Sequence, residues 1–376
     1  MRRIEGHVLT PQGFVDGALS VDDAGRIGAI EGEPVEEAVV RVSDRPLLLP
    51  GFIDLHVHGA GGRDVMEGGD AAAQIARRHA IHGTTALLAT TMTAPMPDLL
   101  RAFEGVAAVA EKRGPGAARV LGVHLEGPYI NSGRLGAQPD FARPVALEEL
   151  ARLHVLAPIR LVTLAPEVPG NLEAIAQLIA AGHRVQLGYT SGSYDDGVQA
   201  LKRGATGFTH LFNAMTGLHH REPGMVGAAL AHAQYAEIIP DLLHVHAGAI
   251  RVALRAIPCL YCVTDSTAAT GMPDGEYRLG RQSVTKCLGG VRLADGTLAG
   301  STLTMDQALR NLVQRLGLSL AEASLRVSTH AADYLGLADR GRLVAGAWAD
   351  LVVLNRELRL QAVYAQGEAI ELAHAG

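Results

Sequence analysis

The sequence is poor in aromatic residues, cysteine and lysine. Aromatic side chains make up 4% of its 376 residues, so the apolar share of 48% rests mainly on alanine, valine and leucine, beside 44 glycines. This composition is typical of α/β layers joined by tight turns. The 3 cysteines are too few for a disulfide framework, which indicates a reducing compartment and predicts a cytoplasmic protein.

Long apolar runs and an excess of basic charge are also missing. No apolar run approaches the roughly 18 residues of a membrane helix, and the first residues lack the apolar core of a signal peptide, so we expect no membrane association. The formal net charge is −6, with no basic stripe, which argues against nucleic acid as a partner. Histidine is plentiful instead, with 16 residues against 3 lysines.

The middle of the chain alternates between apolar, strand-like runs and amphipathic, helix-length stretches. Eight apolar runs begin near Phe52, Thr84, Arg119, Arg160, Arg184, Thr206, Glu237 and Leu260. The clearest helical stretches are 71–81, 96–113, 147–157, 171–181 and 195–203. Eight β–α units over roughly 285 residues predict a (β/α)8 TIM barrel. A doubly wound sheet is the alternative, but no glycine-rich dinucleotide turn follows the first run.

Both ends of the chain read as short strands separated by turns, and we expect them to pair with each other. The predicted organisation is a small β-sandwich domain from residues 1–49 and 338–376, attached to a catalytic barrel of residues 50–337.

The strongest chemical signal is the H-x-H motif in the first barrel strand. Because alternate strand residues share a face, Asp54, His56 and His58 point to one side. They end where barrel enzymes place their catalytic groups, and two imidazoles at this spacing suit one divalent ion. The alternative is that these two histidines only make ordinary hydrogen bonds and bind no metal. The small-residue loop Gly59–Gly62 argues against this, because it lets a ligand approach the backbone.

Three further strands end in polar residues. His124 and Glu126 share a face at the end of the third run, His210 and Asn213 follow the sixth, and Asp265 follows the eighth. Core packing does not explain such a set, because unpaired buried polar groups are costly. The sequence therefore predicts one polar centre at the barrel's carboxyl end.

These motifs resemble those of the amidohydrolase superfamily, and specifically of the N-acetylglucosamine-6-phosphate deacetylase family. The similar stretches run along almost the whole chain; His-Leu-Phe-Asn-Ala-Met at 210–215 and Arg-Glu-Pro-Gly at 221–224 are specific to that family, whereas H-x-H marks the superfamily. The resemblance implies a cytoplasmic homodimer that removes acetate from an amino-sugar phosphate, N-acetyl-D-glucosamine 6-phosphate, using one or two divalent ions. Zinc is favoured over iron, cobalt or manganese.

The resemblance also implies roles for individual residues. Asp265 is similar to the catalytic acid/base, which takes a proton from water and gives it to the departing amine. The implied metal ligands are His56, His58, Glu126 and His210. The implied substrate contacts are Ala137, Gln138, Asn213, Ala214, Arg221, His244, Leu298, Ala299 and Gly300.

Two positions depart from the family pattern. Tyr189 stands where the family has a histidine ligand, and Gln138 where it often has a histidine near the acyl group. Tyr189 either ligates as a phenolate or stays a neutral pocket wall. A phenol pKa near 10 favours the neutral wall, with the metal displaced towards His56, His58, Glu126 and Asp265.

Lysine is absent from all predicted strand ends. Many binuclear relatives bridge their metals through a carbamylated lysine on the fourth strand, so Glu126 is the better bridging candidate here. Two alternative functions remain open: deacetylation of another sugar phosphate such as N-acetylgalactosamine 6-phosphate, and a catalytically impaired sugar-phosphate-binding barrel, which Tyr189 in place of a ligand histidine would explain.

Overall fold

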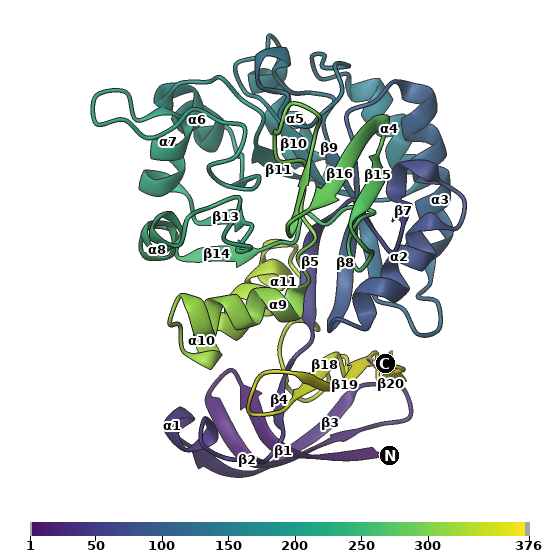
Figure 1. The fold of residues 1–376 in the computed structure, drawn as a ribbon, viewed down its shortest axis with the longest axis vertical. Helices are drawn as coiled ribbons and strands as arrows, with labels where there is room; N and C mark the ends of the chain where they lie inside the picture. The colour runs from purple at the N-terminus through teal and green to yellow at the C-terminus, as the bar shows by residue number, and fades with distance from the viewer. Residues whose placement is uncertain (1, 373–376) are drawn as a thin grey trace.

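The computed structural model describes residues 2–372 and contains a barrel with a smaller β-domain at one end (Figure 1). Eight parallel strands form the barrel: β5 (Phe52–Val57), β8 (Thr84–Thr91), β9 (Arg119–Glu126), β10 (Ile159–Leu164), β11 (Arg184–Leu187), β12 (Gly207–Phe208), β13 (Tyr235–Ile238) and β14 (Cys259–Cys262). They pair in chain order from β5 to β12, and β13 pairs with β14. All eight begin within a few residues of the predicted runs.

Backbone hydrogen bonds close the barrel at its two remaining seams. Leu211 N donates to Glu237 O at 2.9 Å, which joins the end of β12 to β13. Asp265 N donates to His56 O at 3.0 Å, which joins the end of β14 to β5. The predicted (β/α)8 barrel is confirmed.

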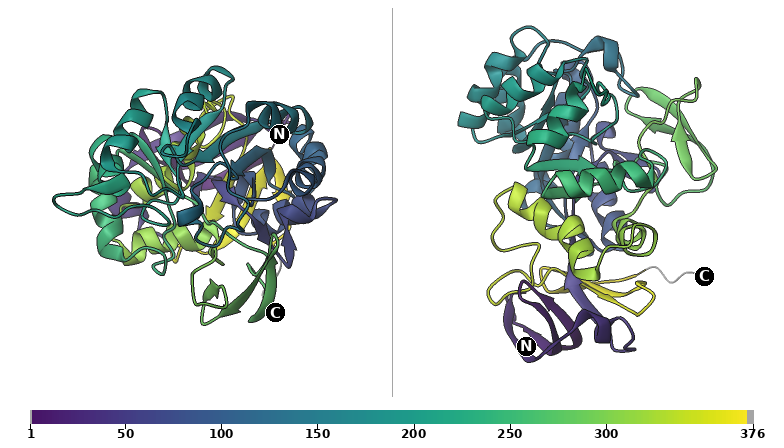
Figure 2. Two further views of the ribbon diagram at one scale, coloured as in Figure 1. Left: turned by 90° about the horizontal axis from the view of Figure 1, so that it is seen from above. Right: turned by 90° about the vertical axis from the view of Figure 1, so that its left-hand side faces the viewer.

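Helices surround the strands, as the view from above shows (Figure 2). They are α2 (Ala71–Ala80), α3 (Met96–Glu111), α4 (Leu147–Leu156), α5 (Asn171–Ala180), α6 (Tyr194–Lys202), α7 (Gly224–His232), α8 (Ala247–Ala256), α9 (Met305–Arg310), α10 (Leu320–Ser324) and α11 (His330–Tyr334). In α3, Leu99, Ala102, Phe103 and Val106 are buried, the spacing of one apolar helix face. No helix within residues 2–372 is long and apolar enough to cross a membrane.

The small domain is a sheet built from both ends of the chain. Its strands are β1 (Arg2–Thr10), β2 (Gly13–Val21), β3 (Ile27–Val35), β4 (Leu47–Pro50), β18 (Leu351–Leu354), β19 (Leu360–Ala365) and β20 (Glu368–Ile370), in the order β20-β19-β18-β4-β1-β2-β3. The helical turn α1 (Glu37–Val40) precedes β4. The predicted pairing of the two ends is confirmed, because β18 lies antiparallel to β4.

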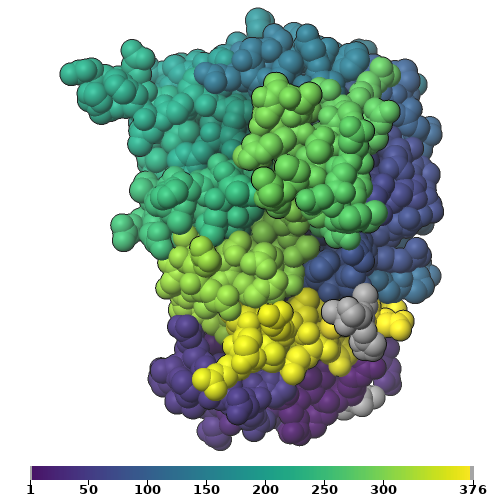
Figure 3. Space-filling view, viewed as in Figure 1, coloured from purple at the N-terminus to yellow at the C-terminus, as the bar shows by residue number. Residues whose placement is uncertain are grey.

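This sheet curls over its own core rather than splitting into two separate sheets. Ile27 N donates to Ala347 O and Ala349 N donates to Gly25 O, both at 2.9 Å, which ties the turn before β3 to the segment before β18. Val8, Leu19 and Leu351 are fully buried in the enclosed core. Figure 3 shows the N-terminal segment in purple and the C-terminal segment in yellow packed together at one end of the molecule. The division at residues 49/50 and 337/338 stays a prediction, as does the homodimer.

The small sheet lies next to the amino ends of the barrel strands, because β4 runs almost directly into β5. The carboxyl ends of the strands, where His56 and His58 lie, therefore face away from it. Short elements cover that end: β6 (Gly59–Ala60), β7 (Arg63–Asp64), η1 (Val65–Glu67) and η2 (Ser132–Arg134). The two remaining helical segments, η3 (Asn311–Arg315) and η4 (Leu325–Thr329), are π-helical turns.

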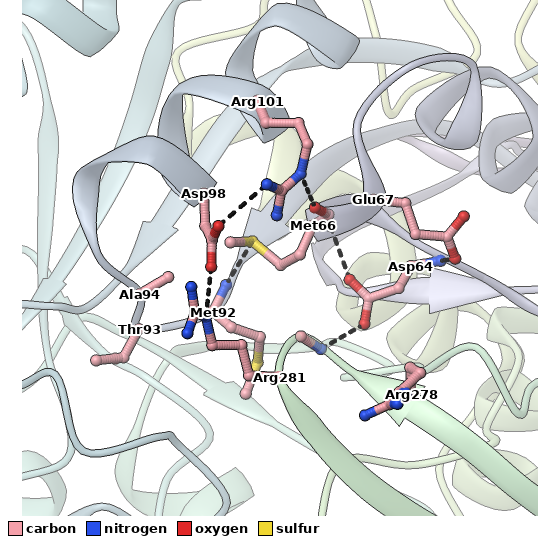
Figure 4. Close-up of a pocket in the computed structure, with 11 residues that line it drawn as sticks. Asp64, Met66, Glu67, Met92, Thr93, Ala94, Asp98, Arg101, Arg278 and Arg281 are labelled. Atoms are coloured by element: carbon pink, nitrogen blue, oxygen red, sulfur yellow. Dashed lines mark hydrogen bonds and ion pairs between the residues drawn. The ribbon is translucent and has the colours of Figure 1, made fainter.

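A three-stranded antiparallel sheet after β14, absent from the sequence predictions, also covers the barrel's face and is called the hairpin below. It comprises β15 (Gly275–Leu279), β16 (Gln282–Cys287) and β17 (Gly290–Arg292). Two carboxylates fasten it to the barrel (Figure 4): Asp98 Oδ2 accepts from Arg281 Nε at 2.6 Å, and Asp64 Oδ2 accepts from Gly280 N at 2.8 Å. The hairpin leads into the predicted Leu298–Gly300 turn and so positions it.

Candidate active site

The structure brings the predicted polar centre together at the carboxyl end of the barrel. His56 and His58 come from β5 and its end, Glu126 ends β9, and His210 and Asp265 follow β12 and β14. All five side chains are almost completely buried. The alternation of strand side chains therefore aims residues from four strands at one point near the barrel axis.

Imidazole nitrogens and carboxylate oxygens lie within contact distance in this centre. His58 Nε2 lies 3.2 Å from Glu126 Oε2 and 3.2 Å from Asp265 Oδ1. His56 Nε2 lies 3.1 Å from Glu126 Oε1 and 3.2 Å from His58 Nε2. His210 Nε2 reaches the same Glu126 Oε1 at 3.3 Å. Glu126 thus contacts all three histidines and lies at the middle of the centre.

The backbone is strained around this centre. Tyr189, His210, Ala214 and Asp265 all have positive φ angles, of 50°, 28°, 52° and 51°. Non-glycine residues adopt this region only at a cost, and such residues gather at functional sites where the surrounding structure holds them. The strand ends turn sharply here, which directs their side chains towards the axis.

The charges of the centre support one another. Burial would raise the pKa of Asp265, but the charge on His56 and the hydrogen bond from His58 outweigh it and lower the pKa. Burial would lower the pKa of His58, but hydrogen bonds to Asp265 and Glu126 raise it to about 9. In the metal-free protein the carboxylates are therefore ionised, and at least one imidazole is charged beside them.

The donor set fits a divalent cation. Glu126 Oε1 is buried and no hydrogen bond within residues 2–372 satisfies it, although two imidazole nitrogens approach within 3.3 Å. His56, His58 and Asp265 offer ligand atoms that lie within 4.8 Å of one another. Nitrogen and carboxylate ligands converging in this way are typical of a catalytic zinc site.

Glu237 is a member of this centre that the sequence analysis did not assign. Its Oε2 lies 3.0 Å from His56 Nδ1 and accepts from His210 N at 3.1 Å. Tyr261 donates its hydroxyl to Oε1 at 3.4 Å. A carboxylate on Nδ1 fixes the imidazole tautomer, so that Nε2 of His56 is left for a metal. The available signal was a glutamate inside the apolar run of β13, where an unpaired charge would be costly.

We expect Glu237→Gln to lower metal affinity by about 10–100-fold, because the amide oxygen can still accept from His56 Nδ1 but no longer brings the negative charge that makes the imidazole a stronger ligand. Competition with a chromogenic chelator measures this affinity directly. Glu357→Gln, at an exposed glutamate, is the matched control and should leave it unchanged. Equal affinities in the Glu237 variant and the unaltered protein would show that the charge of Glu237 does not strengthen His56 as a metal ligand.

Two other inward-facing residues of these motifs, Asp54 and His124, form hydrogen bonds within the barrel. Asp54 Oδ2 accepts from Thr264 Oγ1 at 2.6 Å, which ties β5 to the segment after β14, and burial raises its pKa to about 7. His124 lies behind His56, with its ring nitrogens 3.2 Å from Leu55 O and 2.7 Å from Thr163 Oγ1. Both of its nitrogens are engaged, so His124 has no free atom for a metal.

The two departures from the family pattern, Tyr189 and Gln138, contact each other. Gln138 Nε2 donates to the Tyr189 hydroxyl at 3.3 Å and to Glu126 Oε2 at 2.6 Å. Burial, followed by the charges of Glu126 and Asp265, raises the pKa of Tyr189 well above its ordinary value. This supports the interpretation of Tyr189 as a neutral side chain in the pocket wall rather than as a phenolate ligand of the metal.

A cavity of ≈ 380 Å³ opens beside the centre. Tyr189, His210 and Asp265 line it, together with the predicted substrate contacts Ala137, Asn213, Ala214, His244, Leu298 and Gly300. Asp241 Oδ2 lies 2.7 Å from His244 Nδ1, which leaves Nε2 of His244 for a ligand. The structure thus gathers most of the predicted substrate residues around one space.

Three predicted contacts do not line this cavity. Gln138 and Ala299 are buried behind it, and Arg221 is exposed in the loop before α7. The arginine among its lining residues is Arg134, in η2, which the sequence analysis did not single out. A second cavity, of ≈ 310 Å³ beneath the hairpin (Figure 4), contains none of the predicted site residues.

Taken together, a closed (β/α)8 barrel with buried imidazoles and carboxylates at its carboxyl end defines the class of metal-dependent barrel hydrolases. Residues 47–370 match the model of the amidohydrolase family. The chain belongs to this family, whose members depend on metal, and is a hydrolase.

Curated relatives cover nearly the whole chain. The chain is 40% identical to an N-acetylgalactosamine-6-phosphate deacetylase of Escherichia coli O157:H7, over 96% of this chain and 97% of that protein. It is 38% identical to an N-acetylglucosamine-6-phosphate deacetylase of Vibrio furnissii, over 94% and 91%. The family resemblance inferred from the motifs is confirmed.

A solved structure of a relative supports the same assignment. An N-acetyl-D-glucosamine-6-phosphate deacetylase of Mycobacterium smegmatis, solved as an aspartate-to-alanine mutant with N-acetyl-D-glucosamine-6-phosphate, is 35% identical to this chain. The two folds superpose with a TM-score of 0.88 over 97% of this chain and 98% of that one.

Proposed function

We propose that this chain hydrolyses the amide bond of N-acetyl-D-glucosamine 6-phosphate and releases acetate and D-glucosamine 6-phosphate. The observation that carries this proposal is the Asp265 carboxylate, which faces a cavity beside a buried imidazole–carboxylate centre. Relatives at 36–39% identity over most of the chain bear the name of this deacetylase.

His56, His58, Asp265 and Glu126 would hold one divalent cation, with zinc the favoured ion, and His210 lies against Glu126 beside it. When bound, such a cation acidifies a water molecule and polarises the acetyl carbonyl. Glu237 holds His56 in place from behind. The buried position excludes bulk water, which strengthens every charge interaction in the centre.

Asp265 moves the proton. Its lowered pKa keeps it ionised at neutral pH, so it can accept a proton from the water that attacks the acetyl carbon. As the C–N bond breaks, the same carboxyl group returns that proton to the departing amine nitrogen. Acetate and the free amine are then the two products.

The cavity wall provides contacts for the sugar phosphate. The Arg134 guanidinium suits a phosphate. Burial would lower the pKa of His244, but the hydrogen bond and charge of Asp241 raise it, which favours a positive charge close to an anionic ligand. Asn213 and the Ala214 backbone complete the polar lining. Binding energy at the phosphate would hold the amide in place at Asp265. Arg221 stays a predicted substrate contact, although it does not line the cavity of its own chain.

N-Acetylgalactosamine 6-phosphate is the second candidate substrate, because a relative at 40% identity is named for it. Acetate release should be measured from both epimers and from N-acetylglucosamine without its phosphate, with bound metal quantified alongside. We expect the highest kcat/KM with the glucosamine epimer and the lowest without phosphate. A higher kcat/KM with the galactosamine epimer would reverse the assignment, and metal-free, inactive protein would favour a silent sugar-phosphate binder.

A further inference from the structure

The side-chain carboxylate of Glu167, in the loop after β10, accepts hydrogen bonds from two neighbouring loops. Asn131 Nδ2 donates to Oε1 at 2.8 Å, Ser191 N donates to the same oxygen at 2.6 Å, and Thr190 donates its hydroxyl to Oε2 at 2.6 Å. Hydrogen bonds to a carboxylate are stronger than those between neutral groups. Glu167 does not itself line the active-site cavity, yet it joins the loops after β9, β10 and β11.

The segment 132–137, which contains Arg134, is attached to the barrel at its two ends. Residues 133–137 of this segment line the active-site cavity. In the part of the chain that the structure describes, hydrogen bonds of the segment go to its own atoms, to Asn131 before it and to Gln138 after it. The place of Arg134 at the cavity therefore depends on how these two flanking residues are held.

Asn131 is held in one orientation by contacts at both ends of its side-chain amide. Its Oδ1 accepts from Gly133 N at 2.7 Å and so caps η2. Because a backbone N–H must face an oxygen, the amide nitrogen is the atom that faces Glu167. The backbone N of Asn131 donates to Tyr189 O at 3.0 Å. Glu167 thus supplies the side-chain half of the attachment at this end of the segment.

We propose that Glu167 is a positioning residue for the substrate phosphate, because it holds the segment 132–137 through Asn131 and so keeps Arg134 at the cavity. The inference rests on the proposed deacetylase function, in which Arg134 contacts the phosphate. A carboxylate and a phosphate have charges of the same sign, so a purely electrostatic role of Glu167 would weaken phosphate binding. Positioning strengthens it, and the two roles therefore predict opposite effects when the side chain is removed.

The phosphate preference measures this role. It is the ratio of kcat/KM for acetate release from N-acetylglucosamine 6-phosphate to kcat/KM for release from N-acetylglucosamine. A general loss of structure lowers both values and leaves the ratio unchanged, whereas a misplaced Arg134 lowers only the first. Arg134→Ala should lower the phosphate preference by about 10–100-fold, as for the loss of one hydrogen bond to a charged group.

Glu167→Leu removes both acceptor oxygens and should lower the phosphate preference by about 10-fold or more. Glu167→Gln is the conservative variant: its amide oxygen can accept from Asn131 and Ser191, and its amide nitrogen can donate to the Thr190 hydroxyl oxygen. It should therefore retain the preference. A purely electrostatic role would instead raise the preference in both variants. Glu173→Leu, at an exposed glutamate of α5, is the matched control and should change nothing.

Asn131→Ser tests the link itself, and it decides the question if Glu167→Leu does not fold. Serine can still cap η2 but lacks the amide nitrogen that reaches Glu167. We expect a loss of phosphate preference like that of Glu167→Leu, and no additional loss when Asn131→Ser is combined with Arg134→Ala, because both changes act on one contact.

An unchanged phosphate preference in Asn131→Ser, or a preference raised in both Glu167 variants, would overturn the proposal. Additive losses in the double variant would overturn it as well. If the unaltered protein releases no acetate from any sugar phosphate, the deacetylase function itself fails. Calorimetry with glucosamine 6-phosphate then tests the positioning role alone: binding should be weaker in Asn131→Ser, and equal binding would contradict it.

Discussion

Asp265→Asn is expected to lower kcat by about three orders of magnitude, within the range for loss of general acid–base catalysis. Asparagine has nearly the shape of aspartate but does not accept a proton. It also tolerates the φ of 51° at this position, so the backbone bond from residue 265 to His56 O should persist. The loss would therefore report chemistry rather than folding.

Acetate release gives kcat for this variant, and calorimetry gives its affinity for N-acetylglucosamine 6-phosphate, which should change little. Asp274→Asn, at an exposed aspartate before the hairpin, is the matched control and should retain full turnover. Full turnover in Asp265→Asn would remove Asp265 from the mechanism.

Metal-free protein should lose about 3 kcal/mol of folding free energy as the pH rises from 6.5 to 9, at 1.36 kcal/mol per pKa unit. His58 has a folded-state pKa raised to about 9 from 6.5, because Glu126 and Asp265 hold its imidazolium. A raised pKa means that the folded state binds the proton more tightly. This stability is fully present below pH 6.5 and is lost as the pH passes 9.

A bound cation would supply the positive charge in place of that proton, so the metal-loaded protein should not show this loss. Urea unfolding across the interval, with and without chelator, measures the difference. His58→Gln without metal should remove the His58 share of this pH dependence, and the raised pKa of His56 should account for part of the remainder. An equal free energy of unfolding at both ends of the interval in the metal-free protein would contradict the role of His58.

The barrel and its polar centre could be predicted because their causes are local. Alternation along β5 alone places His56 and His58 on one face, and the period of the buried residues in α3 defines a helix. Strand ends in a barrel converge at one edge. For that reason Glu126, His210 and Asp265 could be assigned to one centre before any geometry was known.

Features that depend on contacts between distant segments escaped prediction. Arg134 reaches the cavity through a short loop whose course depends on its bonds to the segments after β10 and β11, such as the one from Asn131 N to Tyr189 O. Arg221 has the residue type for a phosphate contact, yet its loop carries it to the surface. The link between Tyr189 and Gln138 joins positions 51 residues apart, and no local pattern reveals it.

The most direct test of the central claim is metal titration of the chelated protein, with acetate release from N-acetylglucosamine 6-phosphate measured at each addition. The account predicts that activity is absent after chelation, rises in proportion to added zinc and reaches its plateau at one ion per chain. Activity that survives complete removal of metal would contradict a metal-dependent centre at His56, His58, Asp265 and Glu126.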